Sequence, residues 1–132
     1  MAEYTKLYYT KYVGGHIEYP TAKDCRVFLY NDRLELFLNE GNYKNKPSIA
    51  IPYKSIDVIE SADESKISAL RVAMLGIVGG LWKKKHVYTV IRYKDEFGEK
   101  TVVIDFGKDV EEAQPLIYHK MLEAKKDGAP KS

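Results

Sequence analysis

The fold is decided by the stretch Cys25-Arg-Val-Phe-Leu-Tyr30-Asn-Asp-Arg33-Leu-Glu-Leu-Phe-Leu38. Two runs rich in β-favouring residues flank Asn31-Asp32, a pair that tolerates the positive φ angles of a two-residue turn. In the second run Leu34, Leu36 and Leu38 recur at every second position, so they share one face of a strand. We therefore expect an antiparallel β-hairpin with one buried face.

Further strand material lies on the C-terminal side of this hairpin. Residues 48–51 and 55–59 are typical of strands and are interrupted at Pro52, which favours a break or a bend between two strands. Residues 86–93 and 101–106 flank the polar turn 94–100 and predict a second hairpin. The middle of the chain is therefore expected to form antiparallel β-structure.

A helical period replaces the strand period after Asp109. One apolar stripe recurs at spacings of three or four residues, and its members are Val110, Ala113, Ile117, Met121 and Ala124. Pro115 lies inside this pattern and removes one helical hydrogen bond, so we expect a kink near Ala113. The pattern predicts one amphipathic C-terminal helix, which packs its apolar stripe on the sheet.

Composition limits the classes of function. The chain has 132 residues, which suits one domain with a single core. Its net charge of +2, from 21 basic and 19 acidic residues, is too small to argue for a nucleic-acid partner. The lone Cys25 and an N-terminus without an apolar signal segment point to the cytoplasm.

The order of these elements resembles the pleckstrin-homology-like (PH-like) domains of prokaryotes. The residues that carry the resemblance are Tyr12-Val-Gly-Gly-His16 with Tyr19-Pro20, Arg33-Leu-Glu-Leu-Phe37, Ile51-Pro-Tyr-Lys-Ser-Ile-Asp-Val58 and the helix opening at 109–113. The resemblance implies a mainly β fold, an antiparallel barrel or sandwich of about seven strands capped by one C-terminal amphipathic helix. It also implies a non-enzymatic interaction module whose relatives bind lipids, peptides or one another.

The resemblance sets the expected boundaries. Residues 12–126 form the PH-like domain, and residues 127–132 form a disordered tail. Residues 1–11 are a tyrosine-rich N-terminal arm, either loose or added to the sheet as an edge strand.

The segment 71–85 is the candidate contact surface. Ten apolar residues, Ala73 to Trp82, lie between Arg71 and the triplet Lys83-Lys84-Lys85. This run is too short to cross a bilayer, which takes roughly 20 apolar residues. Tryptophan beside lysines suits the headgroup layer of an anionic membrane. The expected contact residues are Arg71, Met74, Leu75, Ile77, Val78, Leu81, Trp82, Lys83, Lys84 and Lys85.

Three interpretations of this segment remain open. It contacts an anionic membrane surface or a protein partner, it packs between subunits of a homo-oligomer through residues 73–82, or it is a buried element of the monomer. The sequence does not decide whether residues 65–82 form a helix, a strand or a hairpin. A membrane contact would make the cytoplasmic protein peripheral to the membrane.

Catalytic chemistry has little support in the sequence. His16, Cys25, His86 and His119 show no spacing typical of a metal or nucleophilic site, so we expect no enzyme activity, metal or cofactor. The 11 tyrosines are often interleaved with lysines, which raises single-stranded nucleic acid as a lesser alternative. Tyrosine is also a good strand residue, so a structural role explains its abundance equally well.

Overall fold

The computed structural model describes residues 4–19, 21–38, 47–63 and 87–128. Within them, the elements are β1 (Lys6–Gly14), β2 (Lys23–Leu29), β3 (Arg33–Leu38), β4 (Ile49–Pro52), β5 (Ile56–Ala62), β6 (Tyr88–Asp95), β7 (Gly98–Asp105) and α2 (Val110–Gly128). Two short 3₁₀ turns, η1 (Tyr53–Ser55) and η3 (Gly107–Asp109), precede β5 and α2.

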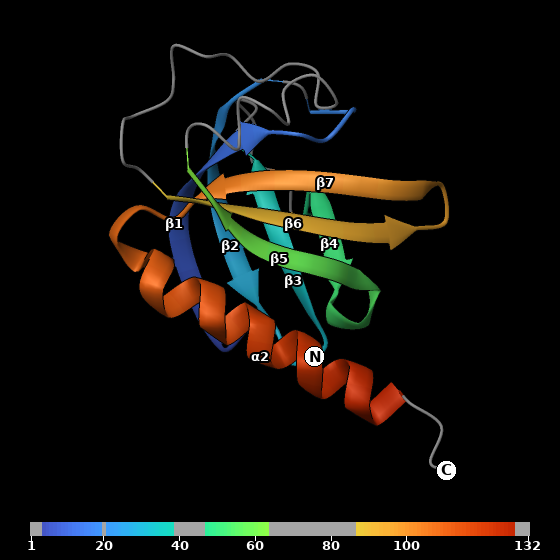
Figure 1. Ribbon diagram of the computed structural model, residues 1–132. Helices are drawn as coiled ribbons and strands as arrows, with labels where there is room; N and C mark the ends of the chain where they lie inside the picture. Colours follow the sequence, from blue (N-terminus) through green and yellow to red (C-terminus); the bar gives the residue numbers. More distant parts are fainter. Residues whose placement is uncertain (1–3, 20, 39–46, 64–86, 129–132) are drawn as a thin grey trace.

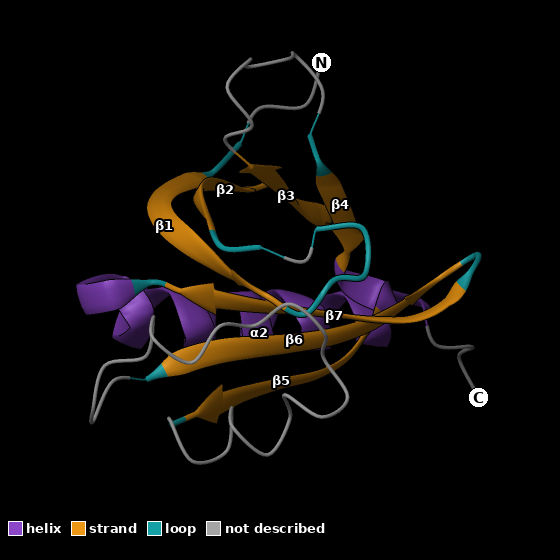
Figure 2. Ribbon diagram, turned by 90° about the horizontal axis from the view of Figure 1, so that it is seen from above, coloured by secondary structure: helices purple, strands orange, loops and turns teal. Residues whose placement is uncertain are grey.

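The seven strands form one antiparallel sheet in the order β4-β3-β2-β1-β7-β6-β5. The sheet folds over so that β2 to β4 lie opposite β5 to β7, with β1 between the two groups (Figure 2). Helix α2 runs below β5 and across the ends of β1 to β3 (Figure 1). The expected mainly β architecture, barrel- or sandwich-like and capped by a C-terminal helix, is confirmed.

The hairpin predicted from residues 25–38 is present as β2 and β3. Its register pairs Cys25 with Leu38 and Val27 with Leu36. The alternating leucines of β3 are buried, with Leu34 and Leu36 fully so. The break expected at Pro52 is also present, and η1 carries the chain from one edge strand of the sheet, β4, to the other, β5.

Strand β1 lies at the centre of the sheet. Residues 6–11, assigned from sequence to the N-terminal arm, are the first part of this strand and pair with β2. The strand is not at an edge, because Lys11 to Gly14 also pair with β7. Because tyrosines lie on both faces of β1, its sequence lacks the alternation of polar and apolar residues by which a half-buried strand is recognised.

The apolar stripe of α2 packs on the core as predicted. Ala113 and Ile117 are fully buried, Met121 is nearly so, and Val110 and Ala124 pack at the margin. The helix is continuous from Val110 through Pro115 and extends to Gly128, two residues into the expected tail. Proline removes the hydrogen bond to the carbonyl four residues earlier, which is that of Glu111, an exposed residue. Water can therefore hydrate that carbonyl.

The hairpin of β6 and β7 is buried on both of its faces. Ile91 and Tyr93 belong to the main core, whereas a second cluster consists of Val13, Ala62, Tyr88, Val90 and Val103. The turn between the two strands is shorter than predicted, because Asp95 already pairs with Gly98.

We predict that Ile117→Ala lowers the free energy of unfolding by about 2–5 kcal/mol, because it leaves a cavity beneath α2. The matched control is Leu122→Ala on the same helix, whose side chain is 45% exposed. That change should stay within about 0.5 kcal/mol. Urea denaturation followed by circular dichroism measures both. Equal effects of the two substitutions would contradict this docking of α2.

Candidate functional site

The segment 71–85 lies outside the described residues, and so do all ten of its predicted contact residues. The structure does describe where the connection containing this segment begins and ends. Strands β5 and β6 are antiparallel neighbours, and Ala62 pairs with Tyr88. The connection formed by residues 63–87 therefore leaves the sheet and returns to it at adjacent positions.

The two histidines that the structure describes, His16 and His119, lie in different surroundings. His16 is buried beside Tyr19, and its Nδ1 accepts a hydrogen bond from the Glu18 amide at 3.1 Å. Burial lowers the pKa of this imidazole. His119 lies on the exposed side of α2, 3.0 Å from the Glu123 carboxylate. His86 lies outside the described residues.

Cys25 has the surroundings of a structural thiol. It is 3% exposed on the core side of β2, where its carbonyl accepts a hydrogen bond from the Thr10 hydroxyl at 3.0 Å. Burial raises the pKa of the thiol to about 12. The thiolate is the nucleophilic form of cysteine. With the raised pKa, the fraction of Cys25 present as thiolate near neutral pH is very small, so we expect it to react slowly.

The tyrosines that the structure describes range from buried to exposed. Five are buried, namely Tyr8, Tyr12, Tyr53, Tyr88 and Tyr93. The Tyr12 hydroxyl donates to the Tyr19 carbonyl at 2.6 Å and accepts from the His16 amide at 2.9 Å, so it fixes the turn after β1. Tyr4, Tyr9 and Tyr118 are the most exposed among the described residues. Much of the tyrosine content therefore serves the core.

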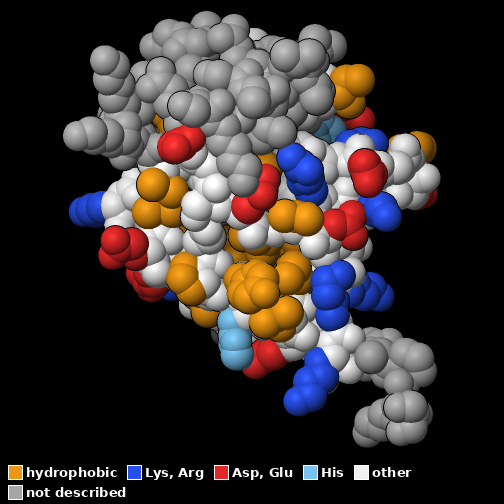
Figure 3. All heavy atoms as spheres, viewed as in Figure 1, with side chains coloured by type: hydrophobic (Ala, Val, Ile, Leu, Met, Phe, Trp, Pro, Cys, Tyr) orange, Lys and Arg blue, Asp and Glu red, His pale blue; other side chains and the backbone are white. Residues whose placement is uncertain are grey.

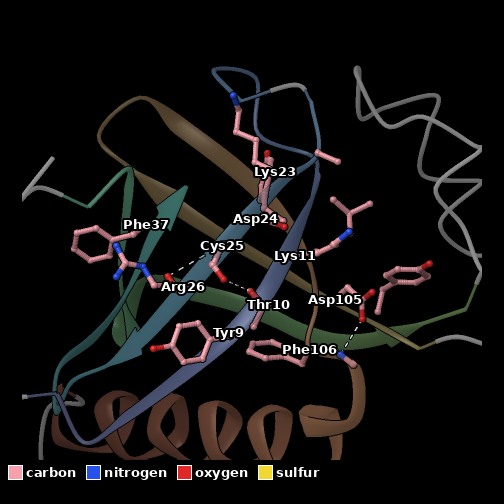
Figure 4. Close-up of a pocket in the computed structure, with 15 residues that line it drawn as sticks. Tyr9, Thr10, Lys11, Lys23, Asp24, Cys25, Arg26, Phe37, Asp105 and Phe106 are labelled. Atoms are coloured by element: carbon pink, nitrogen blue, oxygen red, sulfur yellow. Dashed lines mark hydrogen bonds between the residues drawn. The ribbon is translucent and has the colours of Figure 1, made fainter. Parts of the chain in front are cut away.

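A hollow of about 980 Å³ opens beside β1 and β2 (Figure 4). Its lining includes Tyr9, Arg26 and Phe37 on one side, and Asp105 and Phe106 at the end of β7. Cys25 also contributes to it, but neither His16 nor His119 does. The hollow thus combines aromatic rings with charges of both signs, including the carboxylates of Asp24 and Asp105.

The outward side of β1 to β3 carries an aromatic face, which we define as Tyr4, Leu7, Tyr9, Arg26, Phe28 and Phe37. Pairing places Tyr9 opposite Arg26 and Arg26 opposite Phe37. The Arg26 guanidinium lies about 6 Å from the ring centres of both phenylalanines. Phe28 contacts the Tyr4 and Phe37 rings edge to face, at 5.0 and 5.1 Å. Tyr9 projects furthest and is 74% exposed.

Charged side chains of both signs border the aromatic face. Lys11 is opposite Asp24 in the register of β1 and β2, and both are exposed. At the other end Arg33 contacts Asp32 at 2.7 Å and Glu35 at 2.8 Å. These two cations and three carboxylates leave the border without a surplus of positive charge.

The opposite side of the molecule differs in character. The outward residues of β5 and β6 form ion pairs, Arg92 with Glu60 at 3.7 Å and Lys94 with Asp57 at 3.9 Å. Apolar side chains also gather over β5 and α2 (Figure 3), where Tyr118 and Leu122 are about half exposed. The aromatic face on β1 to β3 is the larger gathering of rings in the described part of the chain.

The aromatic face was not predicted from the sequence. The signal was present in the hairpin, because Arg26, Phe28 and Phe37 alternate with its buried residues and so had to share the outward side. The decisive residue, Tyr9, was not recognised because β1 was not assigned as a central strand.

The described residues contain neither a membrane-spanning helix nor a metal-binding cluster. No helix among them combines the length and the hydropathy that crossing a bilayer requires. No group of three or more histidine, cysteine, aspartate or glutamate side chains within the same ranges is arranged to hold a metal ion. Comparison with protein-family models gives no match, and comparison with curated protein sequences gives no significant match.

We predict that Cys25 in the native protein reacts with Ellman's reagent about a thousandfold more slowly than in the unfolded chain, because a raised pKa depletes the thiolate. The same protein in concentrated urea is the control. Equal rates in buffer and in urea would show that the thiol is accessible and ionised in the folded state.

Proposed function

We propose that the protein is a non-enzymatic, PH-like interaction module that binds an anionic membrane surface or a protein partner through the segment 71–85. The pairing of Ala62 with Tyr88 is the observation that carries this proposal. It brings the two ends of the 63–87 connection together at one end of the sheet. A basic and apolar sequence anchored in this way is suited to present a compact contact surface.

The charge distribution of the segment supports a surface partner. Arg71 precedes the apolar run and Lys83-Lys84-Lys85 follow it, so the four cations bracket one tryptophan-containing stretch. Each basic residue near an anionic leaflet contributes about 1 kcal/mol. Together with insertion of Trp82, this corresponds to attachment of about micromolar affinity, which is reversible.

The observed architecture supports the PH-like assignment. A seven-stranded antiparallel sheet with a C-terminal helix is what the resemblance implies for residues 12–126. We propose the cytoplasm as the site of action, with a peripheral position at the membrane. A single buried cysteine of raised pKa suits a reducing compartment.

We predict that the protein co-sediments with vesicles of phosphatidylserine and phosphatidylcholine in equal parts and is released at high salt, because screening weakens the attraction of the lysines. Replacement of Lys83, Lys84 and Lys85 by alanine should weaken binding about a hundredfold, since three contributions of about 1 kcal/mol are lost. Trp82→Ala should weaken it as well.

The control for Trp82→Ala is Phe97→Ala, which removes another aromatic ring, one that is 80% exposed at the β6–β7 turn. This control should bind vesicles as the wild type does. Absence of binding to these vesicles would reject the membrane as the partner. A solution mass above 15.1 kDa that Trp82→Ala returns to 15.1 kDa would instead identify the alternative, self-association through residues 73–82.

A further inference from the structure

We infer that the aromatic face of β1 to β3 binds a second copy of this chain, forming a two-fold symmetric dimer. This surface consists of Tyr4 and described residues of β1 to β3, and includes none of residues 71–85. Tyr9 provides the starting point, because a tyrosine that is 74% exposed on a sheet face leaves apolar area in water. Tyrosine, phenylalanine and arginine are also the residues most enriched at the centres of protein interfaces.

The charges at the border select a protein partner. Nucleic acids and anionic membranes bind surfaces with a surplus of cations. Here Lys11 is matched by Asp24, and Arg33 is matched by Asp32 and Glu35. A border with two cations and three carboxylates offers a polyanion no net attraction, whereas a protein surface with charges of both signs complements it.

The register of β1 and β2 identifies that partner as a second copy. Consider two copies that stack their outward faces against each other about a two-fold axis. If the axis lies between the two sheets, parallel to the strands and midway between β1 and β2, it places each β1 over the β2 of the other copy. Residues that pair across the two strands then face each other between the copies. The three pairs are Lys11 with Asp24, Tyr9 with Arg26, and Leu7 with Phe28.

Each of these pairs is chemically complementary. Lysine against aspartate is an ion pair, tyrosine against arginine is a cation–π contact, and leucine against phenylalanine is an apolar contact. The symmetry forms each contact twice. No like charges meet along this part of the interface, so the patch is complementary to itself.

The first test measures the mass of the full chain by sedimentation over a range of concentrations. The mass should rise from 15.1 kDa toward twice that value. Tyr9→Asp should hold it at 15.1 kDa, because a carboxylate would replace the central ring. The exposure of Tyr9 makes a folding defect unexpected, and circular dichroism checks it. Phe97→Asp, at an exposed position of the β6–β7 turn, should dimerise as the wild type does.

The second test exchanges the border charges. Asp24→Lys should weaken the dimer at least tenfold, since it places lysine against lysine between the copies. The double variant Lys11→Asp/Asp24→Lys restores both the pair within the chain and the pair between copies, so dimerisation should recover. A monomer at every concentration, or a double variant as weak as the single one, would overturn the inference.

The variants distinguish failure of the dimer from failure of the proposed function. If Trp82→Ala abolishes the dimer and Tyr9→Asp does not, the interface belongs to residues 73–82, and the inference about the aromatic face is wrong. Tyr9→Asp should leave vesicle binding unchanged. Loss of vesicle binding in that variant, combined with a wild-type mass of 15.1 kDa at every concentration, would show that the aromatic face contacts lipid and would reject the dimer.

Discussion

Strand β1 divides its hydrogen bonds between two neighbours, and this division holds the sheet together. It pairs with β2 from Lys6 to Tyr12 and with β7 from Lys11 to Gly14, with a shift of register between Tyr12 and Gly14. One strand thereby joins an N-terminal group of strands to a C-terminal one. The sheet can close over a single main core only because β1 belongs to both groups.

The core and the outer surfaces follow from that arrangement. Tyr8 and Tyr12 point inward from β1, where Tyr8 meets Phe106 edge to face at 5.5 Å and Tyr12 fixes the turn at His16 and Tyr19. Helix α2 covers the same core, and the ion pair of Lys6 with Glu112 at 2.7 Å links its first turn to β1. The outward side chains of the same strand, with Tyr9 among them, form part of the aromatic face.

Local patterns were enough to predict most of the fold. The alternation in residues 33–38 and the helical stripe through Ile117 each describe an element that buries one side. The sequence did not identify β1, because Tyr8 and Tyr9 are adjacent rings that point to opposite sides, one buried and one exposed. It also missed that β6 is buried on both faces, since the second cluster draws Val13 from β1, a strand distant in the sequence. The predicted contact segment lies outside the described residues, and the structure gives only the pairing of Ala62 with Tyr88 on either side of the connection that contains it.

The position of β1 is tested most directly by nuclear Overhauser effects between backbone protons in solution. The pairing of β1 with both neighbours predicts cross-strand contacts from Tyr12 to Lys23 of β2 and, in the same sample, from Tyr12 to Ile104 of β7. Contacts from Tyr12 to β2 alone, with β7 paired elsewhere, would contradict the shared strand.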